Sequence, residues 1–166
     1  MHRPPASDLP RERRLRKDDF RRRVLEALGG ALGERAGRAR EELRQLDAAA
    51  EGETKSSAGD KYETAREMIA QARELQARLL REAEAGLDWV AVQDSGRTRE
   101  AVAAGALFRT DDGWHLVCPM PGDFRVETEN VRGLSLGGPL GTALKGARAG
   151  ESREFRGRRI EVREVV

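Results

Sequence analysis

The residues best suited to chemistry are four carboxylates in and beside a short stretch rich in glycine and serine. They are Glu51, Glu53, Asp60 and Glu63. Their carboxylate oxygens are the groups that could take part in chemistry. Packing of an apolar core does not require acids at these positions. A charged turn between two helices is also commonly only solvated, so the composition here leaves both interpretations open.

The same stretch is the only break long enough to reverse the chain between two long segments rich in Ala, Leu, Arg and Glu. Gly52 and Gly59 lie in it, with Thr54, Ser56 and Ser57 between them. Glycine weakens a helix, and short hydroxyl side chains compete for its backbone hydrogen bonds. We therefore predict that residues 51–61 form the tip of a helical hairpin.

The segments on either side of the tip carry apolar residues at helical spacing. In the first arm these are Phe20, Val24, Leu28, Leu32, Ala39, Leu43 and Leu46. In the return arm they are Tyr62, Ala65, Ile69, Ala72, Leu75, Leu79, Ala83 and Leu87, and Gly86 is expected to end that helix. The spacing predicts an antiparallel coiled-coil hairpin over residues 18–90. Four glycines in the first arm, at positions 29, 30, 33 and 37, predict either close helix approach or a kink.

Beyond residue 100 the pattern changes to short alternating runs. Residues 101–110 and 114–118, separated by Asp-Asp-Gly, predict a strand hairpin, and residues 124–128 and 131–136 predict further strands. Pro139 to Lys145 predicts one short helix, followed by a closing hairpin. The fold class is therefore α+β, with a small antiparallel-sheet domain over residues 101–166.

The N-terminal segment is basic. Residues 1–17 are expected to form a disordered tail, and the arginines from Arg11 to Arg23 predict a nucleic-acid contact, such as DNA binding, through clustered positive charge. A solvated helix start explains the same residues, since no aromatic side chains are interleaved to stack on bases. The whole chain has 31 Lys and Arg against 29 Asp and Glu, so net charge alone indicates no polyanionic partner.

The sequence lacks the features of several classes of protein. Cys118 is the only cysteine, so no intrachain disulfide can form. No apolar run is long enough to span a membrane, and the N-terminus has no secretory h-region, so we expect a cytoplasmic monomer. His115 and Cys118 alternate in a predicted strand without further ligands, which favours packing over a metal or nucleophile role. Trp89 and Trp114 are interpreted as packing residues.

Two stretches together resemble the Gre family of bacterial transcript-cleavage factors. The first is G-x-P-L-G-T-A-L-K-G-A-R-A-G-E, residues 137–151. The second is the tip, with Gly52, Glu53, Thr54 and Lys55 followed by Tyr62, Ala65, Arg66 and Glu67. The resemblance covers residues 18–166, with both motifs in the family's order.

The tip departs from the family pattern. Family members carry two acids three positions apart; Glu53 matches the first, but Ser56 stands at the second. Two extra residues precede Tyr62, and Asp60 could supply the missing acid from another position. The sequence is therefore similar to a divergent branch of the family.

The resemblance implies a fold, a partner and a set of site residues. The C-terminal domain would be FKBP-like and would bind bacterial RNA polymerase through its hallmark segment, with Pro139, Leu140, Leu144, Gly146 and Gly150 as partner-binding residues. The hairpin would enter the secondary channel and offer Glu53 and Asp60, with Glu51 and Glu63 as lesser candidates, to the Mg²⁺ of the polymerase active centre. Gly52, Lys55, Ser56 and Tyr62 would shape the tip. The chain itself would hold no cofactor and would be an accessory factor, not an enzyme.

Other functions fit parts of the same sequence. A secondary-channel inhibitor that does not support cleavage is favoured by Ser56. A coiled-coil adaptor would need only the helices, with the acids incidental. Peptidyl-prolyl isomerase activity is disfavoured, because that chemistry needs an aromatic-lined pocket and only 4% of residues are aromatic.

Overall fold

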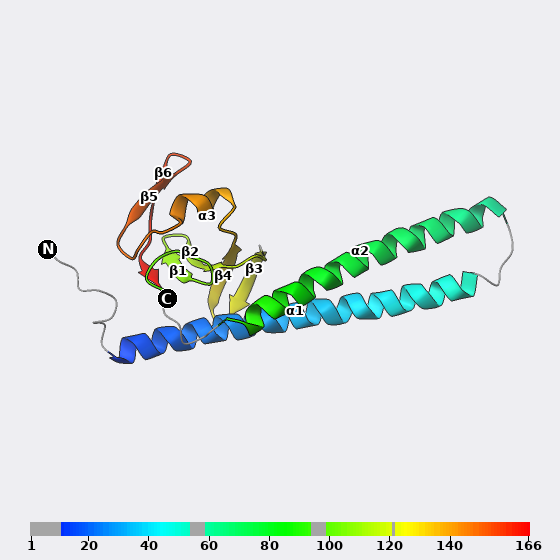
Figure 1. Ribbon diagram of the computed structural model, residues 1–166, viewed down its shortest axis with the longest axis horizontal. Helices are drawn as coiled ribbons and strands as arrows, with labels where there is room; N and C mark the ends of the chain where they lie inside the picture. Colours follow the sequence, from blue (N-terminus) through cyan, green and yellow to red (C-terminus); the bar gives the residue numbers. More distant parts are fainter. Residues whose placement is uncertain (1–10, 54–58, 94–98, 121) are drawn as a thin grey trace. The chain divides into compact units, whose positions relative to one another are not determined.

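The chain folds into a helical hairpin and a small sheet domain with one short helix, as predicted (Figure 1). The computed structural model describes residues 11–53, 59–93, 99–120 and 122–166, without the side chains of residues 11–15, 53, 60 and 61. It divides into two compact units. The sheet unit comprises Met1–Leu28 and Val92–Val166, and the hairpin unit comprises Gly29–Ala91.

The hairpin is built from helix α1, Arg11–Glu53, and helix α2, Gly59–Ala91. Small and medium apolar side chains close its seam: Leu32, Ala36 and Ala39 of α1 and Ala83 of α2 are buried. Two ion pairs cross between the helices, Arg40 with Glu84 at 2.7 Å and Arg73 with Asp47 at 2.8 Å. The heptad-like spacing of the seam explains why these sequences pair side by side.

The predicted seam of α2 is wrong at two positions. Leu75 and Leu79 are 44% and 42% exposed, whereas their neighbours Gln76 and Leu80 are half-buried. Successive residues are about 100° apart around a helix, so a small rotation decides which of two adjacent positions faces the partner. A buried Ala83 fixes that rotation here.

The glycines do not interrupt either helix. Helix α2 continues through the buried Gly86 as far as Ala91, so the expected stop there is wrong. Helix α1 is continuous through Gly29, Gly30, Gly33 and Gly37, the four positions that predicted close helix approach or a kink. At one of them, Gly29, an added Cβ would lie 3.6 Å from a Val90 methyl, in ordinary contact. At Gly30, Gly33 and Gly37 an added Cβ would meet no atom within 4 Å, so close helix approach does not explain these three glycines.

Helix α1 begins at Arg11, so residues 11–17, expected in a disordered tail, are helical. Residues 1–10 lie outside the described residues. This helix packs in the sheet unit: Val24 and Leu25 are buried, and the Phe20 ring lies 5.0 Å from that of Trp114. Lys17 forms an ion pair with Glu164.

Arg21 is fully buried in the sheet unit. Its Nε and Nη2 atoms donate hydrogen bonds to the carbonyl oxygen of Gly105, at 3.2 and 2.9 Å. Gly105 has φ of +76°, and an added Cβ would lie 2.6 Å from the Gln93 side-chain oxygen. The conformation that presents this carbonyl therefore favours glycine.

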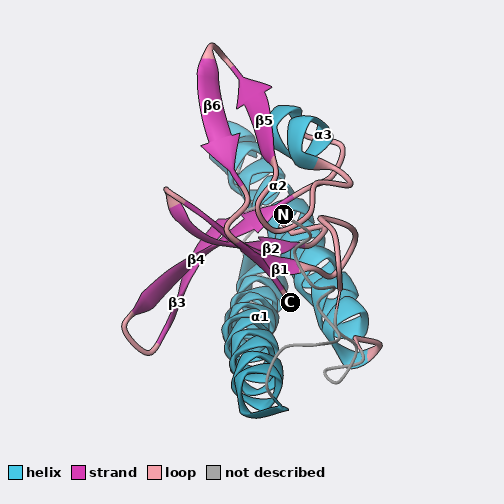
Figure 2. Cartoon of the chain, turned by 90° about the vertical axis from the view of Figure 1, so that its left-hand side faces the viewer, coloured by secondary structure: helices cyan, strands magenta, loops and turns pink. Residues whose placement is uncertain are grey.

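A five-stranded sheet forms the centre of the sheet unit, in the order β3-β4-β2-β1-β7 (Figure 2). The strands are β1 Leu107–Thr110, β2 Gly113–Val117, β3 Gly122–Val126, β4 Glu129–Leu134 and β7 Glu164–Val165. Every pair is antiparallel except β2 with β4, which is parallel. The first strand is shorter than predicted, because Ala101 forms an isolated bridge with Arg148 instead of extending β1.

The predicted closing hairpin divides between two sheets. Strands β5 Ser152–Phe155 and β6 Arg158–Glu161 form a separate two-stranded sheet, and β7 then joins β1. Helix α3, Pro139–Leu144, packs against β5. The hydrophobic core of the sheet unit contains Val102, Phe108, Leu144, Ala147 and Val162. None of the described helices is both long and apolar enough to cross a membrane.

The Arg21 contact yields a stability prediction. Arg21→Met keeps the apolar stem but leaves the Gly105 carbonyl without its donor, so the free energy of unfolding should fall by about 1–3 kcal/mol. Urea unfolding followed by tryptophan fluorescence measures the change, because Trp114 lies in this unit. Arg22→Met is the matched control, since Arg22 is exposed on the same helix. Equal stability of the two variants would contradict a structural role for the buried guanidinium.

Candidate functional site

The predicted hairpin tip lies between the C-terminus of α1 and the N-terminus of α2. Helix α1 ends at Glu53 and α2 begins at Gly59, whose φ is +66°. Lys55 and Ser56 lie outside the described residues, as do the side chains of Glu53 and Asp60. The backbone nevertheless shows at which helix end each acid stands.

The acids at the two helix ends lie in opposite electrostatic environments. Asp60 and Glu63 lie near the start of α2, where the helix dipole favours negative charge. Glu51 and Glu53 lie in the last turn of α1, where the dipole disfavours it, and that turn contains no basic residue. The α2 acids therefore have a structural explanation, whereas the α1 acids stand against the local field.

The other described tip residues are consistent with a surface turn. Glu51, Gly52 and Glu63 are exposed, and Tyr62 is half-buried. The Arg66 guanidinium lies 5.5 Å from the centre of the Tyr62 ring. This cation–π contact lets the tyrosine support the first turns of α2. Within the described part of the chain no group of three or more His, Cys, Asp or Glu residues could hold a metal ion. The Mg²⁺ site at Glu53 and Asp60 stays a prediction.

The second predicted site, the segment from Pro139 to Glu151, is largely used by the fold. Pro139 occupies the first turn of α3 and is exposed, and Leu140 is half-buried against the core. Leu144 is fully buried, which leaves it no surface to offer a partner. Gly146 and Gly150 have φ of +77° and +89°, so both serve turns that favour glycine.

Tight packing and hydrogen bonds hold this segment in place. An added Cβ at Gly141 would lie 2.0 Å from the Ser135 carbonyl oxygen, so only glycine fits there. The Glu151 carboxylate accepts hydrogen bonds from the Arg148 backbone N–H at 3.1 Å and from Arg153 at 2.9 Å. The Arg148 backbone hydrogen bond is the main cause that lowers the pKa of Glu151 below its ordinary value. The motif residues thus position a small exposed surface around Pro139.

Part of the N-terminal basic cluster, for which a nucleic-acid contact was predicted, makes contacts within the protein, whereas Arg16 is exposed. Among the described side chains, Arg21 is buried, and Arg22 forms ion pairs with Asp19 and Glu26. Arg23 forms ion pairs with Asp19 at 3.1 Å and with Glu127 at 3.4 Å. Residue types could not separate Arg21, which packs, from its two paired neighbours.

His115 and Cys118 are buried packing residues, as expected. The Nε2 atom of His115 lies 3.0 Å from the Thr110 hydroxyl, and its ring stacks on Phe108 with centroids 5.0 Å apart. In the described structure Nδ1 has no hydrogen-bond partner. Burial, followed by the positive charge of Arg132, lowers the pKa of His115 below its ordinary value.

This burial predicts a pH dependence of stability. Because the pKa of His115 is lower in the folded than in the unfolded state, the unfolded chain takes up the proton first. Stability should therefore be complete above pH about 6.5 and decrease below it, by at most about 1.4 kcal/mol per pH unit. Thermal melts at pH 7.5 and 5.5 should show a larger loss for the wild type than for His115→Gln. Equal losses would mean that His115 is not the titrating group.

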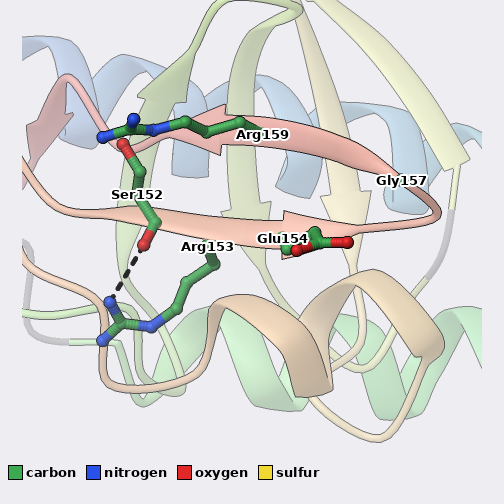
Figure 3. A pocket seen from close by; sticks show the side chains of 5 residues that line it. All are labelled: Ser152, Arg153, Glu154, Gly157 and Arg159. Carbon is green, nitrogen blue, oxygen red and sulfur yellow. Dashed lines mark hydrogen bonds between the residues drawn. The ribbon is translucent and has the colours of Figure 1, made fainter.

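The sequence interpretation missed the arginines at the turn between β5 and β6. Arg156, Arg158 and Arg159 are three of four consecutive residues, and all are exposed. The absence of any acid in that run was the signal that could have drawn attention to it. The β5–β6 hairpin also bears a shallow, open depression (Figure 3). It is lined by Ser152, Arg153, Glu154, Gly157 and Arg159.

Comparison with known proteins adds one structural likeness. The sequence matches no family model, and a comparison with curated proteins likewise gives no match. Among solved structures, the chain is similar to one titled "Structure of the transcription factor Gfh1". The identity is 21%, the alignment covers 84% of this chain and 93% of that one, and the TM-score is 0.29. A likeness at this level carries no argument about fold or function.

Proposed function

We propose that this protein is a Gre-type accessory factor that binds bacterial RNA polymerase and acts through its hairpin tip on transcript cleavage or pausing. The observation that carries the proposal is the pair of acids in the last turn of α1. The helix dipole opposes negative charge at this end of the helix, and the last turn itself contains no basic residue. Residues kept at a local cost are candidates for function.

The hairpin unit is suited to carrying such acids. Helix α2 comprises 33 residues. At a rise of about 1.5 Å per residue, its length is about 50 Å. Its pairing with α1 through a buried seam and two ion pairs makes a stiff element, whereas a loose linker would lose reach through its entropy. A stiff hairpin could place a carboxylate in a channel that the sheet unit does not enter.

The chemistry would belong to the polymerase. Phosphodiester cleavage requires a metal-activated water and stabilisation of the developing negative charge. Mg²⁺ keeps several waters and accepts one or two carboxylates from outside, which Glu53 and Asp60 would supply at the tip. Glu51 and Glu63 are the lesser candidates.

The matching of the sequence motifs supports the choice of partner. The segment around Pro139 resembles the family's docking segment, and the sheet unit holds it with an exposed Pro139. Docking by this unit and action by the tip would be separate functions of the chain. Variants of one should therefore spare the other.

An inhibitor that blocks the secondary channel without supporting cleavage is the second candidate. It is favoured by Ser56, a hydroxyl at the position where the family pattern has its second acid. A coiled-coil adaptor is the third candidate, and exposed Met68, Leu75 and Leu79 on α2 favour it. Their spacing of seven and four residues gives α2 a second apolar stripe.

The test uses backtracked elongation complexes and the full-length protein. Loss of an outer-shell partner of a metal typically costs about 10- to 100-fold in activity. Glu53→Gln should therefore slow 3′ RNA cleavage by at least about tenfold. Asp60→Asn should have a smaller effect, and the double variant should abolish stimulation. Polymerase affinity should not change, because docking is assigned to the sheet unit.

Glu82→Gln is the matched control, since Glu82 is exposed on α2 and lies outside the tip motif. If the protein instead blocks the channel sterically, Glu53→Gln will leave inhibition intact, and removing two heptads from each helix will relieve it. If every tip variant stimulates cleavage and inhibits transcription as the wild type does, these acids have no function in either activity.

A further inference from the structure

The turn between β5 and β6 presents three exposed arginines in four residues. These are Arg156, Arg158 and Arg159, separated by Gly157. Figures 1 and 2 both show this turn at the outer end of the sheet unit, beyond the five-stranded sheet. The turn is therefore accessible on more than one side.

The backbone of the turn is one in which arginine is unfavourable. Phe155 pairs with Arg158, so the loop has two residues, and both have positive φ: 51° at Arg156 and 73° at Gly157. Two-residue hairpin loops of this kind prefer Asn-Gly or Gly-Gly, because side chains other than those of Asn and Asp crowd the left-handed region. The Arg156 guanidinium lies 5.2 Å from the Phe155 ring, a contact that asparagine could not make. An arginine is thus kept where local structure favours another residue.

The charges at the turn are only weakly engaged within the protein. Arg158 lies 3.6 Å from Asp112, and its side chain is 73% exposed. An ion pair so open to solvent contributes little to stability. Arg159 stands directly opposite Glu154 in the strand register, yet it forms no ion pair in the described structure. Figure 3 shows these two side chains reaching in opposite directions along the hairpin. The described N-terminal arginines from Arg21 to Arg23, in contrast, are buried or paired.

We propose that this turn binds the phosphate backbone of a nucleic-acid duplex. Guanidinium groups match phosphate oxygens in charge and geometry, and each neutralised phosphate releases counterions. Adjacent residues of a strand point to opposite faces, so Arg158 and Arg159 flank the ribbon on both sides. A groove about 12 Å wide admits a two-stranded ribbon and has phosphates along both edges.

An acidic protein helix fits this arrangement less well. It would present its carboxylates to one face of the ribbon and leave the other arginine unused. Glu154 lies opposite Arg159, and Glu161 lies farther along the strand; both carboxylates would repel phosphate, so contact is confined to the turn end of the β5–β6 hairpin. Binding should therefore be weak, independent of base sequence and sensitive to salt.

The test measures binding of the full-length protein to a fluorescent 20-base-pair DNA duplex by anisotropy, over a range of salt concentrations. The variant Arg156→Asn/Arg159→Gln should lower the slope of log affinity against log salt by about 2 and weaken binding roughly tenfold or more at 0.1 M salt. Asparagine tolerates positive φ, so the hairpin should stay folded, and an unchanged melting temperature checks this.

Arg35→Gln/Arg78→Gln is the matched control, because it removes the same charge from exposed helix positions in the hairpin unit. It should bind DNA nearly as the wild type does. The proposal fails if the wild-type protein does not bind the duplex, if the control loses as much affinity, or if a single strand or poly-glutamate binds as tightly. Polymerase is absent from this assay, so its outcome is independent of the proposed function in transcription.

Discussion

The sheet unit depends on the burial of one positive charge. Arg21 has no exposed surface, and its guanidinium donates to the carbonyl of Gly105, 84 residues away in the chain. A charge removed from water is costly unless its donors are satisfied, so any register of α1 that loses this acceptor is strongly disfavoured. Gly105 is equally constrained, since the required φ favours glycine and Gln93 occupies the space of a side chain. Together, Arg21 and Gly105 hold the N-terminal part of α1 against the segment that leads into strand β1.

Local sequence patterns could predict some features of this structure, whereas features that depend on tertiary contacts, such as the burial of Arg21, could not be predicted. The hairpin helices, the short helix from Pro139 and most strands follow from apolar spacing and from Gly and Pro positions. The start of α1 was missed because residues 11–17 are mostly basic and polar and carry no apolar residues at helical spacing. Arg21 has the same residue type as Arg22 and Arg23, so burial could not be assigned to it. Leu75 and Leu79 were misplaced because an adjacent set, Gln76 and Leu80, also fits the spacing.

The candidate site was predictable in composition and not in geometry. The acids around the tip stand out in the sequence, but their division between two helix ends required the observed helix limits. Those limits give the acids unequal status, because the dipole accommodates Asp60 and Glu63 and opposes Glu51 and Glu53. The motif around Pro139 was interpreted as a docking segment, whereas Leu144 and the turn glycines serve the core and the backbone. A resemblance in sequence does not separate residues that position a surface from those that form it.

Cross-linking from the tip tests the central claim, that the hairpin carries acids to the polymerase active centre, most directly. Cys118 is the only cysteine and is 3% exposed, so Ser56→Cys would give the chain one reactive thiol at the tip. A thiol-directed cross-linker attached there would be mapped on bound RNA polymerase by mass spectrometry. Cross-links to the catalytic subunit beside the active-site Mg²⁺ are expected. Cross-links confined to surfaces remote from the active centre, with the protein still bound, would contradict it.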